Sequence, residues 1–153
     1  MYNNLQLRGF AYYNNPEMFK YAEKYFKYKL GKKYFLRKTQ NLLAERYLKD
    51  FVYTKGKVNA WNGIDDGTNK WHNDLVEGCN TAFLLYLSDL PEEVGGGLSL
   101  KNIDDKEHIT IWPKKYDIVI MNQAHQFIHR VEPLKQKTNR YVCHIEFDIK
   151  GFK

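Results

Sequence analysis

His72 and Asp74 are the residues in this sequence whose types and spacing most clearly suggest chemistry. They lie two positions apart in residues 70–75, which read as an extended strand, so both side chains would point to the same side. An imidazole and a carboxylate on one side are two of the three protein ligands of a 2-His-1-carboxylate iron site. Short motifs of this kind also occur by chance, so the pair is a hypothesis that needs a third ligand.

The elements before this pair should be a strand at residues 5–13 and two basic helices, the first over 15–31 and the second near 38–50. Asn15, Pro16 and Glu17 together favour a helix start, because they supply a cap, a residue suited to the first turn and a negative charge. Lys55 and Gly56 predict a turn, and residues 62–69 are rich in Asn, Asp and Gly, which is typical of a loop.

Beyond residue 69 the pattern predicts almost only strands, at residues 70–75, 81–87, 98–100, 109–112, 118–121, 129–131 and 141–149. Short strands at regular spacing with turns between them indicate a sandwich or barrel. The helices must bury one face, most simply against one sheet. We therefore expect a single domain over residues 1–153, with residues 1–56 as strand and supporting helices and residues 57–149 as the β-core.

Composition excludes several classes of protein. The chain has 153 residues, enough for one domain with a proper core. Lys and Arg number 24 against 18 Asp and Glu, giving a net charge of +6, but the charges are mixed and predict an ordinary solvated surface. Cys79 and Cys143 make no disulfide framework. No apolar run is long enough to span a membrane and no signal peptide is visible, so we expect a cytoplasmic location. We also expect a monomer.

Further motifs follow the His72–Asp74 pair in a fixed order: an apolar strand through Tyr86, glycines at 95–97, Trp112-Pro113 with Asp117 four residues on, His129-x-Val131-x-Pro133, and Asn139-Arg140-Tyr141. Taken together they resemble the prolyl-hydroxylase-like branch of the 2-oxoglutarate- and Fe(II)-dependent dioxygenases. The resemblance covers residues from about 57 to 149. It departs at the turn between the fourth and fifth strands of the family pattern, where the family usually has Gly and this chain has Tyr116-Asp117.

The resemblance implies a role for each matching residue. His72, Asp74 and His129 look like the iron triad and hence the catalytic centre. Arg140 looks like the residue that binds the distal carboxylate of 2-oxoglutarate, and Tyr86 like a hydroxyl contact to the same carboxylate. A guanidinium suits this role because it can bind a carboxylate through two hydrogen bonds.

One alternative to this ligand set is His125, which lies four residues before His129. We prefer His129 because Val131 and Pro133 follow it at the places that the family pattern expects. Tyr86 could instead be an ordinary core tyrosine, since a buried hydroxyl needs a partner in any case. We interpret the triple glycine as a bulge or a close approach of two backbones.

The fold implied is mainly β with N-terminal helices: a distorted double-stranded β-helix, or jelly roll, with the helices packed on one sheet. The activity implied is hydroxylation of an aliphatic C–H bond, most plausibly on a peptidyl proline, with conversion of 2-oxoglutarate and O2 to succinate and CO2. Fe(II) would be the cofactor and ascorbate a candidate reductant. Alternatives are a nucleic-acid demethylase or small-molecule hydroxylase of the same superfamily, or a non-catalytic jelly-roll binding module.

Two expectations concern the surroundings of the site. Counting by two from Arg140 puts Val142 and His144 on its side of the last strand, so His144 should lie in the barrel interior near the site. The mouth should be bordered by residues 62–69, by Asn59 and Trp61, and by residues 88–96. Acidic pairs in 62–69 and 88–96 would repel phosphates, which favours a peptide or protein over nucleic acid.

Overall fold

The computed structural model describes residues 10–14, 16, 51–62, 70–74, 81–122 and 126–149. The two expected helices lie outside these residues except for Pro16, and so do Cys79, His125 and most of the 62–69 loop. The side chains of residues 51–62 and of Cys143 are also outside the described part. Within that part, no helix has the length and apolar character of a membrane span.

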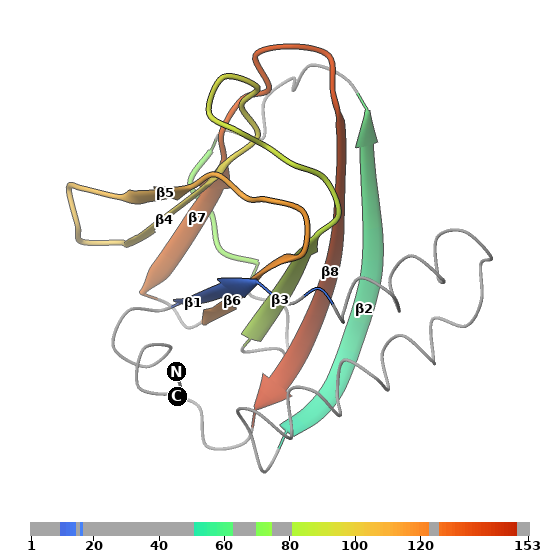
Figure 1. The fold of residues 1–153 in the computed structure, drawn as a ribbon. Helices are drawn as coiled ribbons and strands as arrows, with labels where there is room; N and C mark the ends of the chain where they lie inside the picture. The colour runs from blue at the N-terminus through green and yellow to red at the C-terminus, as the bar shows by residue number, and fades with distance from the viewer. Residues whose placement is uncertain are drawn as a thin grey trace.

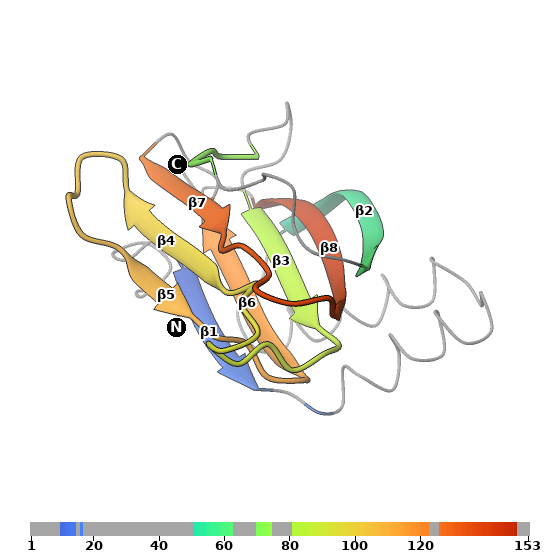
Figure 2. The ribbon, with the colours of Figure 1, turned by 90° about the horizontal axis from the view of Figure 1, so that it is seen from above.

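The described part of the chain contains eight strands in two sheets that face each other (Figures 1 and 2). One sheet has the order β1-β6-β3-β8-β2 and the other the order β5-β4-β7, and every pairing is antiparallel. The strand bounds are β1 Phe10–Asn14, β2 Phe51–Asn62, β3 Thr81–Tyr86, β4 Leu98–Asn102, β5 Ile109–Ile111, β6 Asp117–Asn122, β7 Phe127–Val131 and β8 Asn139–Ile149.

Residues 70–74 lie along the edge of β7 that β4 leaves open. His72 and His129 form an isolated antiparallel bridge and exchange two backbone hydrogen bonds, with N···O distances of 3.0 and 2.8 Å. The predicted strand at 70–75 is therefore a single bridge within the described residues. It adds the His72–Asp74 segment to the three-stranded sheet, beside His129.

The core lies between the two sheets. Every residue of β3 is buried. This confirms the prediction, made from the continuous apolar run, that this strand is covered on both faces. Alternate β3 side chains join the inter-sheet core, whose buried members are Ala82, Leu84, Tyr86, Leu90, Leu98, Leu100, Ile111, Val119, Met121, Leu134 and Val142. The central strand of the larger sheet is thus anchored on both sides, which gives the site a rigid support.

The turn predicted at Lys55 and Gly56 is wrong. Strand β2 runs through both residues, paired with β8, and the register shifts between Tyr53 and Lys55. Such an irregularity inserts an extra residue and bends a strand without ending it. Local turn chemistry was therefore overridden by pairing with the long strand β8.

The glycine segment packs against residues 133–135 and against Arg140 near the start of β8. Gly95 and Gly96 have φ of +83° and +74°, and an added Cβ on Gly95 would lie 2.0 Å from the backbone oxygen of Pro133. Gly95 pairs with Leu134 in an isolated bridge. The predicted close approach of two backbones is confirmed, and only glycine fits this position without strain.

The start of β6 is fixed by a buried carboxylate. Asp117 accepts hydrogen bonds from the Tyr12 hydroxyl, from Asn14 Nδ2 at 2.8 Å and from the Lys114 backbone at 2.7 Å. Tyr116, where the family usually has Gly, has a φ of 78° and takes the left-handed conformation that the turn requires. The departure in residue type therefore leaves the turn geometry in place.

Candidate metal and cosubstrate site

His72, Asp74 and His129 come together at the junction of residues 70–74 with β7. His72 Nε2 lies 3.6 Å from Asp74 Oδ1, and His129 Nε2 lies 3.4 Å from Asp74 Oδ2. The three ligand atoms lie within 4.8 Å of one another. Ligands at right angles around an ion about 2.1 Å away would be about 3 Å apart, so the cluster is near the size that a metal ion needs.

The orientation of His72 favours metal binding. Its Nδ1 lies 2.7 Å from the backbone oxygen of Lys70, so Nδ1 carries the proton and donates it to that carbonyl. The Nε2 atom is then left to face Asp74. Metal-binding histidines commonly donate their second ring N–H in this way, which fixes both tautomer and ring direction.

The electrostatics of the cluster keep Asp74 ionised. The hydrogen bond from His129 lowers the pKa of the Asp74 carboxyl to about 2 from 3.8, although burial acts to raise it. The charges of His129, His144 and His72 contribute to the same lowering of the pKa. A carboxylate that stays charged and two imidazoles form a donor set suited to a divalent first-row metal.

Arg140 and Tyr86, the two residues expected to bind the cosubstrate, lie beside each other in the structure. Arg140 is only 8% exposed, and its Cζ lies 5.8 Å from the centre of the Tyr86 ring. Its Nε donates a long hydrogen bond of 3.4 Å to the Gly96 carbonyl. Among the described residues no carboxylate pairs with this guanidinium. A buried cation without a counter-charge is costly, so the position is suited to a bound anion.

The Tyr86 hydroxyl points to the same conclusion. It is completely buried and has no hydrogen-bond partner among the described residues. Burial raises its pKa, and the Arg140 guanidinium acts in the opposite direction. Within the described part of the chain, a buried hydroxyl thus lies beside a guanidinium that has no carboxylate partner, and a carboxylate ligand could accept hydrogen bonds from both.

The strand β8 links the two halves. Arg140, Val142 and His144 are all buried, so the predicted inward-facing side of β8 is confirmed. The His144 charge acts on Asp74, and this places His144 near the metal cluster, as expected. The interior row of β8 therefore runs from Arg140, beside Tyr86, to His144, near the His72–Asp74–His129 cluster.

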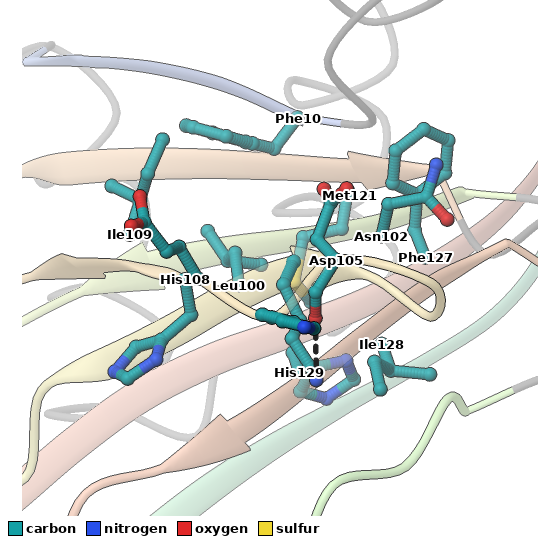
Figure 3. A pocket seen from close by; sticks show the side chains of 13 residues that line it. Phe10, Leu100, Asn102, Asp105, His108, Ile109, Met121, Phe127, Ile128 and His129 are labelled. Carbon is teal, nitrogen blue, oxygen red and sulfur yellow. Dashed lines mark hydrogen bonds between the residues drawn. The ribbon is translucent and has the colours of Figure 1, made fainter.

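A cavity of about 720 Å³ opens beside His129 (Figure 3). Phe10 of β1 lies on one side, and Ile128 and His129 of β7 lie on the other. No residue of the segment 88–96 lines it; Gly96 lies against Arg140 instead. The sequence-based prediction that 88–96 borders the mouth is therefore not met at this cavity. The loop before Lys70 and the Trp61 side chain lie outside the described residues.

The chain matches the family model of the 2OG-Fe(II) oxygenase superfamily over residues 57–146. It therefore belongs to this superfamily and is an oxidoreductase of the dioxygenase type. The family implies Fe(II) and 2-oxoglutarate as cofactor and cosubstrate. No curated protein sequence matches the chain at a significant level.

Solved structures share the fold. A prolyl hydroxylase from Trichoplax adhaerens, in complex with a peptide fragment of the hypoxia inducible factor oxygen degradation domain, is 16% identical with a TM-score of 0.69, and the match covers 97% of this chain and 87% of that one. A Pseudomonas putida prolyl-4-hydroxylase is 14% identical with a TM-score of 0.70, covering 99% and 92%. AviO1 from Streptomyces viridochromogenes is 12% identical with a TM-score of 0.69, covering 99% and 95%. The distorted double-stranded β-helix is thus confirmed.

Sequence reasoning missed three features around the site. The Lys70 carbonyl that orients His72 and the Gly96 carbonyl that contacts Arg140 are backbone atoms, and residue types do not reveal them. Trp71, directly before the His-x-Asp pair, lies close to the side chains of Lys101 and Arg130 of the smaller sheet and of His108 just before β5. Its position next to His72 was the available signal, since the same alternation that turns His72 inward turns Trp71 outward.

Proposed function

We propose that this protein hydroxylates an aliphatic C–H bond of a peptide or protein, at a prolyl residue, using Fe(II), 2-oxoglutarate and O2. His72, Asp74 and His129 would hold the metal, and Arg140 and Tyr86 would bind the distal carboxylate of 2-oxoglutarate. The observation that carries the proposal is a three-ligand cluster together with a buried guanidinium and a buried hydroxyl that, among the described residues, have no carboxylate partner.

In this proposal some residues bind the cosubstrate or the metal, and others orient the metal ligands. When bound, Fe(II) and 2-oxoglutarate supply the oxidation, in which 2-oxoglutarate and O2 give succinate, CO2 and a hydroxylated product. Arg140 and Tyr86 set the depth to which the dicarboxylate enters. Lys70 holds the His72 proton at Nδ1 and so keeps Nε2 available. Metal binding displaces any proton from the His129 Nε2 that faces Asp74.

The cavity beside His129 is the proposed place for the substrate side chain. Its volume lies in the range of small-molecule and side-chain pockets. Apolar side chains of β1, β4, β6 and β7 line it, which suits a proline ring better than a charged group. Its charged lining residues are balanced, two lysines against two carboxylates: Lys101, Lys106, Asp105 and Glu107.

Two further arguments favour a peptide. A balanced rim gives no attraction for a phosphate backbone, on which nucleic-acid affinity largely depends. The structural neighbour from Trichoplax adhaerens was solved with a peptide in complex. Both arguments support a peptide over a nucleic-acid base or a free metabolite as the substrate.

The test is uncoupled turnover: formation of succinate from 2-oxoglutarate with Fe(II) under air and without substrate. The parent should form succinate, and His72→Ala and His129→Ala should not. His125→Ala serves as the matched control and should keep the parent's rate. If the parent forms no succinate, or if His125→Ala is inactive and His129→Ala active, the proposed centre is wrong.

A further inference from the structure

The outer face of the smaller sheet carries a side-chain cluster around Trp71. The Arg130 guanidinium carbon lies 4.7 Å and Lys101 Nζ 5.1 Å from the centre of the Trp71 ring. The His108 ring meets it edge-on at a centroid distance of 5.4 Å. Cations at these distances from a tryptophan ring are attracted to it. The indole thus reaches from residues 70–74 across β7 to β4 and to the residue before β5.

Arg130 is itself held in place by a row of hydrogen bonds. Its Nε donates to Glu132 Oε1 at 2.9 Å, and the same carboxylate accepts from the Ser99 hydroxyl. Ser99 in turn lies 2.8 Å from the Thr110 hydroxyl. Burial acts to raise the pKa of Glu132, but these hydrogen bonds outweigh it and lower that pKa. The row crosses β5, β4 and the end of β7 and ends on the Trp71 ring.

The metal-ligand segment depends on such an anchor. His72 contacts β7 through an isolated bridge, so a regular ladder does not fix how the segment is turned about its own axis. His72 and Asp74 face inward, and Trp71 faces the other way. A rotation that freed the indole would swing both ligands away from His129.

We propose that Trp71 is a positioning residue for the metal centre, held by Arg130 and Lys101 on the outer face so that His72 and Asp74 stay directed at the ion. This inference rests on the proposed metal centre. Trp71 touches neither the metal nor the cosubstrate in this scheme. Its effect is on affinity and coordination geometry, which can be measured without turnover.

The experiment is an anaerobic Co(II) titration of the metal-free protein, followed by visible absorption, because the intensity of the Co(II) bands reports coordination geometry. Trp71→Ala should weaken Co(II) binding about 10-fold, the lower end of the loss seen when supporting partners of metal ligands are removed. Its band intensities should also change. Trp71→Phe keeps a ring between the two cations and should stay within about threefold of the parent.

Trp112→Ala is the matched control. Trp112 is also partly buried with a lysine near its ring, Lys135 Nζ at 5.9 Å, but it packs against Gly97, away from the metal ligands. It should bind Co(II) like the parent. Equal binding by Trp71→Ala and the parent overturns the inference, and so does an equal loss in Trp112→Ala.

A second variant covers the case in which Trp71→Ala does not fold. The double variant Lys101→Met and Arg130→Met keeps the indole and removes both cations, and it should weaken Co(II) binding at least threefold; parent-like affinity overturns the inference. A parent that binds no Co(II) through His72 overturns the proposed centre together with the inference. If the parent binds Co(II) and Trp71→Ala binds it equally well, the inference about Trp71 is overturned and the proposed metal centre is not.

Discussion

At the scale of single residues, the proposed function depends on side chains whose surroundings fix their charge state. Arg140 and Tyr86 are buried beside each other without a carboxylate among the described residues. Asp74 is kept ionised by its neighbours. The burial of Arg140 and Tyr86 costs free energy in the empty protein, which is expected of residues that are prepared for a ligand.

Arg140→Ala should raise the dissociation constant for 2-oxoglutarate by roughly two to four orders of magnitude, because losing a buried charge-assisted pair costs about 3–5 kcal/mol. Mn(II) affinity should be nearly unchanged. Arg140→Lys keeps the charge but lacks the planar guanidinium, so its dissociation constant for 2-oxoglutarate should lie between those of the parent and Arg140→Ala. Lys114→Ala, on an exposed residue, is the control. Calorimetric titration with Mn(II) present measures these constants, and parent-like binding by Arg140→Ala would show that another group holds the carboxylate.

The Asp74 carboxylate should stabilise the metal-free protein in a defined pH range. Because its folded-state pKa is about 2, below the ordinary 3.8, this stability is present above pH 3.8 and is lost as pH falls through about 2. At pH 6, Asp74→Asn should therefore have a free energy of unfolding that is lower than the parent's by about 2 kcal/mol at most, measured by urea unfolding. This gap between parent and variant should narrow below pH 4. Asp104→Asn, on an exposed turn, should show no gap. A gap that is constant with pH would contradict this assignment.

At the scale of elements, the site is assembled where segments distant in sequence meet. Alternation along strands was enough to predict the inward row of Arg140, Val142 and His144. It was not enough to predict that β2 passes through Lys55 and Gly56, because that depends on pairing with β8. Backbone contacts made by Lys70 and Gly96 could not be predicted for the same reason: they exist only once the fold has formed.

The glycine segment gives a prediction at this scale. Gly95→Ala should destabilise the fold by about 2 kcal/mol or more, because the residue has a positive φ and its Cβ would clash with the Pro133 backbone oxygen. Glu93→Ala, exposed in the same segment, should change stability by less than about 0.5 kcal/mol. Urea unfolding midpoints compare the two. Equal midpoints for Gly95→Ala and the parent would mean that the segment can move away from Pro133.

At the scale of the whole molecule, the net charge of +6 would favour nucleic acid as a substrate, whereas the balanced charges around the cavity favour a peptide. Salt screens remote charges, so the local balance near the cavity should decide binding. The family and the fold were predictable from the sequence because the order of the matching residues follows the family pattern: His72, Asp74, His129 and Arg140. A single domain over residues 1–153, a monomeric state and a cytoplasmic location stay predictions.

Proline-containing peptides should stimulate succinate formation, and methylated oligonucleotides should not. The reason is that the apolar part of the cavity lining can take a proline ring, while the two lysines of the lining are balanced by two carboxylates and give no net attraction for phosphates. A peptide with alanine in place of proline is the matched control and should stimulate less. Stimulation by oligonucleotides alone, with affinity that falls steeply as salt rises, would reverse the choice of substrate.

The most direct test is a crystal structure with Mn(II) and 2-oxoglutarate, in which the anomalous signal locates the metal. We predict one metal ion bound by His72 Nε2, the Asp74 carboxylate and His129 Nε2, with the distal carboxylate of 2-oxoglutarate on Arg140. Metal bound elsewhere, or through His125 in place of His129, would contradict the account.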